Sequence, residues 1–105
     1  MNDVFCYLTD EQEICPETTA WGELAWHIND YESLLTLLHD KKSIVLGGDI
    51  LDFNMDHTYD NWHYDDNSEL LLEDNVKSSI SVARNYLSSY IKSNGDKYYV
   101  VFVLG

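Results

Sequence analysis

Carboxylates and imidazoles, which bind metal ions and transfer protons, are concentrated in one short segment of the chain. Its members are Asp56, His57, Asp60, His63, Asp65 and Asp66. On an extended strand that rises ~3.3 Å per residue, His57 and His63 are about 20 Å apart, too far to share a metal ion. The aspartate spacing also differs from that of a calcium-binding loop. We therefore expect no metal site and no cofactor.

Motifs that would indicate an enzyme are missing from the sequence. The chain has no Ser-His-Asp ordering, no Gly-rich phosphate loop and no His-Glu-x-x-His motif. Gly47-Gly48-Asp49 is followed by Ile50 and Leu51, and glycines inside a strand often mark a bulge or a close approach of two backbones. We predict no catalytic residues, so the protein is not expected to be an enzyme.

The balance of charge is the strongest signal in the composition. Asp and Glu number 19 against 6 for Lys and Arg, which gives a formal net charge of −13 at pH 7. Residues 43–76 contain no Lys or Arg at all. A negative field repels nucleic acid and anionic membranes and attracts a basic partner. The charge therefore predicts a basic protein partner, no nucleic acid and no membrane; a surface kept soluble by excess carboxylate is the alternative.

Aromatic residues alternate with acids between residues 59 and 66, and the pattern has two interpretations. One face of a strand packs in the core while the other is solvated, or aromatic anchors and steering carboxylates form a contact patch for a protein. Trp62 belongs to the core in the first interpretation and to the patch in the second. The predicted partner-binding residues are Asp49, Asp52, Asp56, Tyr59, Asp60, Trp62, Tyr64, Asp65, Asp66 and Glu69.

Two helices are expected from the spacing of apolar residues, at about 30–41 and 74–94. Asn29 and Glu32 fit a capping box at the start of the first helix. Gly95 is well placed to end the second helix, because glycine adopts a positive φ without strain.

Three strands are expected, at about 43–53, 57–65 and 97–104. The first two flank a turn and should form an antiparallel hairpin. The third is an uninterrupted apolar run, which is typical of a central strand covered on both faces. Together the elements predict an α+β fold in which two helices pack on a small, mostly antiparallel sheet. The length predicts a single domain, residues 1–105.

The N-terminal segment and the cysteines bear on the compartment. Residues 1–4 lack the basic and apolar regions of a secretory signal, and Cys6 and Cys15 match no zinc or redox spacing. No apolar run approaches the ~20 residues that span a bilayer. We expect a cytoplasmic protein whose cysteines are reduced.

Two strand motifs give a resemblance to a known family. A Gly-Gly-Asp strand at Ile44–Leu51 follows the first helix, and an Asp-Asn-Trp strand at Tyr59–Tyr64 precedes the second. From about Trp21 to the C-terminus the chain resembles small bacterial immunity proteins of polymorphic toxin and contact-dependent growth inhibition systems. The resemblance implies that it binds and neutralises a cognate toxin domain in the cell that makes it. Many such toxins resemble nucleases, which tend to be basic, and an acidic inhibitor suits them.

Two other classes of function stay open on the sequence. A nucleic-acid mimic that inhibits a DNA-binding protein would share the acidic character, but it needs carboxylates spaced along an elongated face. A small metal-binding or enzymatic domain would have to use the Asp/His segment. Broad inhibition of unrelated DNA-binding proteins would favour the first class, and stoichiometric metal binding would favour the second.

Overall fold

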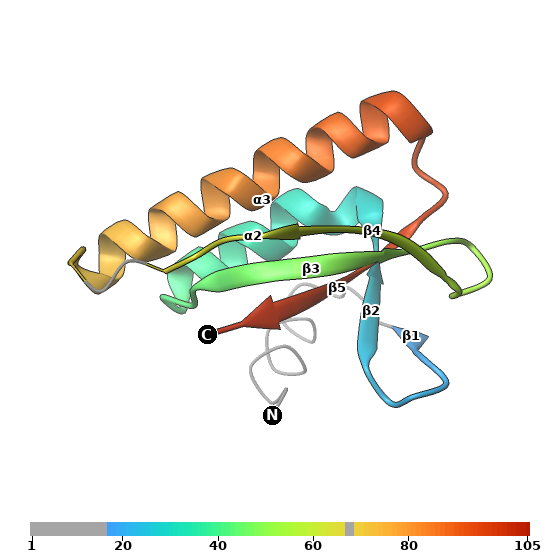
Figure 1. Ribbon diagram of the computed structural model, residues 1–105, viewed down its shortest axis with the longest axis horizontal. Coiled ribbons are helices and arrows are strands. Elements are labelled where there is room, and N and C mark those ends of the chain that lie inside the picture. The colour runs from blue at the N-terminus through green and yellow to red at the C-terminus, as the bar shows by residue number, and fades with distance from the viewer. Residues whose placement is uncertain (1–16, 67–68) are drawn as a thin grey trace.

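A computed structural model describes residues 17–66 and 69–105 of the chain, so the N-terminal segment with both cysteines lies outside the described residues. The elements are β1 (Glu17–Thr18), β2 (Leu24–His27), the 3-10 helix η1 (Ile28–Asp30), α2 (Tyr31–Asp40), β3 (Val45–Leu51), β4 (His57–His63), α3 (Leu72–Asn94) and β5 (Tyr99–Leu104). Helices α2 and α3 lie on the same face of a five-stranded sheet (Figure 1). The predicted α+β class is confirmed.

The sheet has the strand order β1-β2-β5-β3-β4, and every neighbouring pair is antiparallel. The predicted hairpin of β3 and β4 is confirmed, and β5 is the central strand as expected. Each predicted helix and strand begins and ends within two residues of its predicted bounds. Strands β1 and β2 were not predicted, because runs of two and four residues are too short to show an alternating pattern.

The apolar run of β5 is explained by clusters on both faces of the sheet. Val100 and Phe102 belong to the main core, which the buried leucines of α2 and the apolar stripe of α3 complete. Val101 belongs to a second cluster on the opposite face, together with Ala25 and Leu51. Residues 100–102 are therefore buried on both faces of the sheet, which explains their unbroken apolar run, whereas Val103 towards the end of the strand is exposed.

The glycines of β3 make room for a tryptophan on the neighbouring strand. Gly48 pairs with Trp62 of β4, and a Cβ atom on Gly48 would lie 2.5 Å from the Trp62 ring and 2.5 Å from the Val101 carbonyl oxygen. Gly47 has a φ of 152°, at a point where the register of β3 against β5 shifts. The Gly-Gly-Asp and Asp-Asn-Trp motifs thus form one packing unit across two strands.

The predicted capping box at the first helix is wrong. The chain enters α2 through η1, whose first turn is capped by the His27 ring accepting a hydrogen bond from the Asn29 backbone N–H. The Asn29 side chain donates to Asp96 (2.9 Å), which holds the pKa of that carboxyl below its usual value. Glu32 accepts from Arg84 of α3 (2.9 Å). The side chains of Asn29 and Glu32 are therefore bonded to residues distant in the chain and do not cap the helix.

The end of α3 follows the prediction. Gly95 has a φ of 92°, and its N–H donates to the Ile91 carbonyl at 2.7 Å. Although α3 is the longest helix described, neither it nor any other helix in residues 17–66 and 69–105 is long and apolar enough to cross a membrane.

Candidate functional site

Strand β4 divides most of the predicted partner-binding residues into two groups, because its seven residues extend over about 20 Å. The hairpin group, at the β3–β4 turn and in the first four residues of β4, is Asp52, Asp56, Tyr59 and Asp60. The distal group, beyond the end of β4, is Tyr64, Asp65, Asp66 and Glu69. Asp49 and Trp62 lie between them, on β3 and β4. The acids therefore border an edge strand instead of forming one cluster.

Asp52 shapes the turn of the hairpin. Its carboxylate accepts hydrogen bonds from the backbone N–H groups of Asn54 (2.8 Å) and Asp56 (3.0 Å). The turn displays Phe53, whose side chain is 69% exposed, and leaves Asp56 exposed as well. Asp52 thus acts through the backbone, whereas Phe53 and Asp56 are open to a partner.

Tyr59 stands out from the edge strand in an unfavourable backbone conformation. Between the pairs Asp49–Asn61 and Leu51–His57 the register shifts, so that β4 contains two more residues than β3 over this interval. Within this bulge Tyr59 has a φ of 67° and is 86% exposed. A non-glycine residue held at such a φ costs about 1 kcal/mol or more, and such strain is concentrated at functional sites.

Neighbouring side chains hold the bulge in place. The Thr58 hydroxyl donates to the Ile50 carbonyl (2.9 Å) and accepts from the Asp60 N–H (3.1 Å). The Asn61 side chain donates to the Tyr59 carbonyl (3.3 Å). These bonds determine the direction of Tyr59, so the exposed ring is presented on a fixed backbone.

Three rings form a stacked row at the start of β4, called here the aromatic row: Trp21, His57 and Tyr59. The Trp21 and His57 ring centroids are 4.8 Å apart at 17°, and those of His57 and Tyr59 are 6.1 Å apart at 27°. Trp21 is 46% exposed, and its indole N–H donates to Glu23. It is absent from the predicted residues because it reaches β4 from the β1–β2 turn, which no local spacing reveals.

The inward side of β4 is fastened to α3. Tyr90 donates a hydrogen bond to the Asp60 carboxylate (2.8 Å). Trp62 is only 8% exposed and stacks on Tyr86 at 5.1 Å, which in turn stacks on Tyr90 at 5.9 Å. Trp62 therefore lies in the core, as in the first interpretation of the alternating pattern, and it supports the exposed side of β4 from behind.

Burial, followed by the hydrogen bond to Asp60, raises the pKa of Tyr90 to about 12. A raised pKa of an acid means that its neutral form is favoured by folding, so this stabilisation is complete below pH 10 and is lost as the pH rises towards 12. We expect Tyr90→Phe to lower the free energy of unfolding by about 1 kcal/mol at pH 7, because the Asp60 bond is lost. It should also flatten the fall in stability between pH 10 and 12. Urea unfolding across that pH range measures both effects.

Tyr86→Phe is the matched control, because Tyr86 makes ring contacts but its hydroxyl has no hydrogen-bond partner among the described residues. It should change stability at pH 7 by less than about 0.5 kcal/mol. Equal losses in the two variants would contradict a stabilising bond between Tyr90 and Asp60.

The distal group precedes α3 in the chain, and one of its members contacts the first turn of that helix. The Tyr64 hydroxyl donates to the Asn75 side chain (2.9 Å), and the His63 ring lies 2.6 Å from the Asp65 carboxylate. Asp65, Asp66 and Glu69 are all exposed.

On the other strand of the hairpin, Asp49 pairs with Asn61 and is half-buried. Across residues 17–66 and 69–105, no three acids, histidines or cysteines are grouped as a metal site.

The aromatic row is exposed and has carboxylates beside it, and a comparison with known families gives the class of protein to which the chain belongs. The sequence matches the Immunity protein 40 family over residues 13–104. The chain therefore belongs to the Immunity protein 40 family and is an immunity protein that binds a cognate toxin protein. The predicted resemblance to bacterial immunity proteins is confirmed. Neither the curated proteins nor the solved structures gave a match.

Proposed function

We propose that the protein neutralises a basic, nuclease-type toxin by binding it through the hairpin group, the aromatic row and the distal group, without catalysis of its own. The observation that carries the proposal is Tyr59, an aromatic ring that is 86% exposed, held outward by a strained backbone and flanked by carboxylates. Aromatic anchors surrounded by charged residues are typical of the centre and rim of a protein interface.

Charge supports a basic partner. Most acids of the two groups lie beyond the ends of β4 and Asp60 lies at its middle, and the whole segment of residues 43–76 has no Lys or Arg to offset them. A nuclease must attract phosphate, so its substrate cleft is positive. The acidic surface is complementary to such a cleft or to a basic surface beside it, and complementary fields raise the rate of association.

The toxin domain encoded by the neighbouring gene is the partner to test, because immunity genes usually lie beside their toxins in the systems that this sequence resembles. Co-expressed with a tagged toxin domain, the protein should co-purify at 1:1 and abolish toxin activity in a nuclease assay. The proposal fails if the toxin is bound but degrades no nucleic acid. Broad inhibition of unrelated DNA-binding proteins would indicate a nucleic-acid mimic instead.

Neutralising acids in both groups should slow association. We expect Asp60→Asn, Asp65→Asn and Asp66→Asn together to lower the association rate constant about tenfold at low salt, because long-range steering is lost. The difference from the natural chain should shrink as salt rises. The fold should persist, since Asn keeps an oxygen that accepts the Tyr90 hydrogen bond. Stopped-flow kinetics over a salt series measures the effect.

A control with the same change in net charge separates local steering from total charge. Glu17→Gln, Asp30→Asn and Asp40→Asn remove three acids from β1 and from the two ends of α2. These changes should slow association much less than the first set. Equal slowing in the two variants would mean that the acidic groups beside β4 are only a solvated surface.

A further inference from the structure

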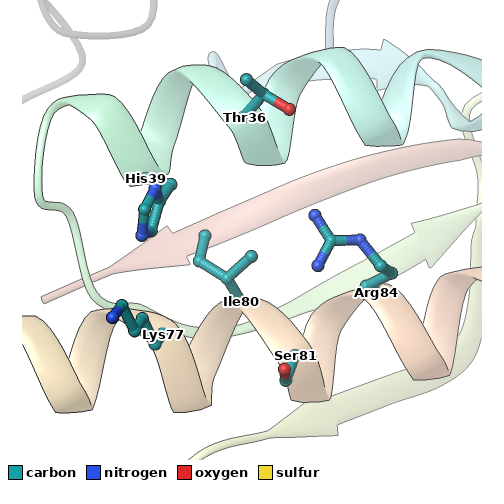
Figure 2. A pocket seen from close by; sticks show the side chains of 6 residues that line it. All are labelled: Thr36, His39, Lys77, Ile80, Ser81 and Arg84. Carbon is teal, nitrogen blue, oxygen red and sulfur yellow. The ribbon is translucent and has the colours of Figure 1, made fainter.

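A groove between α2 and α3 is lined by basic side chains, which are scarce on this acidic chain. It has a volume of about 350 Å³ and is lined by Thr36, His39, Lys77, Ile80, Ser81 and Arg84 (Figure 2). The chain has only 6 Lys and Arg residues, and two of them border this groove. We call it the helix groove.

Helical spacing places the polar residues of α3 on one side. Lys77, Ser81 and Arg84 are separated by four and three positions, so they lie on successive turns along one side of the helix. Ile80, which is buried, forms the floor between them. Figure 2 shows His39 pointing from α2 towards α3 and Arg84 pointing from α3 towards α2. Donors from both helices therefore line the same groove.

The donors of the groove are only partly used. Arg84 gives its Nε–H to Glu32 (2.9 Å), and both side chains remain partly exposed. A guanidinium carries five N–H donors in a planar fork that matches a carboxylate, so most of them remain for another acceptor. Lys77 is exposed and has no hydrogen bond or ion pair with residues 17–66 and 69–105. The groove can hold an anionic group.

We propose that the helix groove receives an Asp or Glu side chain of the cognate toxin and thereby sets the orientation of the complex. Charge complementarity indicates which anionic group occupies the groove. A small free anion is repelled by the net charge of −13. A carboxylate on a basic protein can reach the groove, because the rest of that protein is attracted to the acidic chain. The proposal rests on the proposed function, because the toxin must also contact the acidic side of the molecule.

Helix α3 makes simultaneous contact feasible, since it borders both surfaces. Tyr86 and Tyr90 face β4, while Lys77 and Arg84 face α2. The described molecule measures 40 × 29 × 22 Å, and a standard interface of ~800 Å² per partner is wide enough to extend across one helix. Acids on one side of α3 and cations on the other favour one orientation, because a reversed toxin would meet like charges.

Lys77→Gln and Arg84→Gln, made singly in the full chain, test the proposal. Each should raise the Kd for the toxin domain of the neighbouring gene about tenfold, through faster dissociation, with the association rate nearly unchanged. Arg84→Lys should fall between Arg84→Gln and the natural chain, because it keeps the charge and loses the planar fork. Surface plasmon resonance gives both rate constants, and thermal unfolding verifies that each variant folds.

Lys92→Gln is the matched control, since Lys92 is exposed on the last turn of α3 outside the groove. It should leave the Kd within twofold of the natural value. A toxin variant in which one acid is replaced by Lys should restore binding to Lys77→Glu, and it would identify the occupant.

The outcomes distinguish this inference from the proposed function. Unchanged affinity in Lys77→Gln and Arg84→Gln, together with slowed association in the Asp60, Asp65 and Asp66 variant, would overturn the inference about the groove and leave the proposed function intact. NMR shifts at the groove with 5 mM sodium phosphate, together with unchanged toxin affinity, would make it a site for small anions and also overturn the inference. A natural chain that binds no toxin would overturn both proposals.

Discussion

Tyr59→Gly is expected to weaken toxin binding at least about 30-fold, equivalent to about 2 kcal/mol, which is the usual effect of removing an interface hot spot. The fold should be as stable as before or gain up to about 1 kcal/mol, because glycine adopts a positive φ without strain. Binding and stability are therefore predicted to move independently or in opposite directions. Isothermal titration calorimetry measures the first, and urea unfolding measures the second.

Two further variants separate the ring from the backbone. Tyr59→Ala removes the ring but keeps a Cβ at a φ of 67°, so it should lose the same affinity without the gain in stability. Lys42→Gly relieves a similar conformation, at a φ of 56°, on an exposed residue just after α2, and it should leave affinity unchanged. If Tyr59→Gly keeps the affinity of the natural chain, Tyr59 does not belong to the interface.

Gly48→Ala is expected to lower the free energy of unfolding by about 3 kcal/mol, at the upper end of the usual cost of overpacking. The added Cβ would lie 2.5 Å from both the Trp62 ring and the Val101 carbonyl oxygen. The ring could rotate away only by leaving the core, and the carbonyl belongs to the central strand. Because a small domain is stable by about 5–15 kcal/mol, the variant should be marginal. Guanidinium unfolding followed by tryptophan fluorescence gives the value.

Gly22→Ala controls for conformational strain alone. Gly22 has a φ of 91°, but a Cβ there would meet no atom within 4 Å, so only the backbone preference opposes the change, at about 1 kcal/mol. Adding Trp62→Leu to Gly48→Ala should recover part of the loss at most, because the contact with Val101 remains. Equal stability of Gly48→Ala and Gly22→Ala would contradict the packing of Trp62 against β3.

The main elements were predictable because each one buries a face of its own. The leucines of α2 recur at helical spacing, and the apolar run of β5 lies between two apolar clusters. Helix caps were not predictable from the same pattern. Asn29 and Glu32 bind Asp96 and Arg84, which are distant in the chain, and these tertiary bonds replace the local ones.

The candidate site was predictable in composition but not in arrangement. Tyr59 and the acids around it were predicted as contact residues, and they border an exposed edge strand. Trp21 could not be predicted, because its stacking on His57 depends on the distant β1–β2 turn. Trp62 had two possible environments, and only the pairing of β4 with the glycines of β3 places it in the core.

The sequence by itself determined the class of fold, the sign of the charge and the family resemblance, because periodicity, composition and motifs are local properties of the chain. Only the tertiary structure decided which aromatic rings and acids share a surface. That outcome depends on the bulge at Tyr59, on the register of β3 against β4 and on the contact of Trp21 with His57. A shift of one residue reverses the face of every side chain on a strand, and pairing between distant segments sets the register.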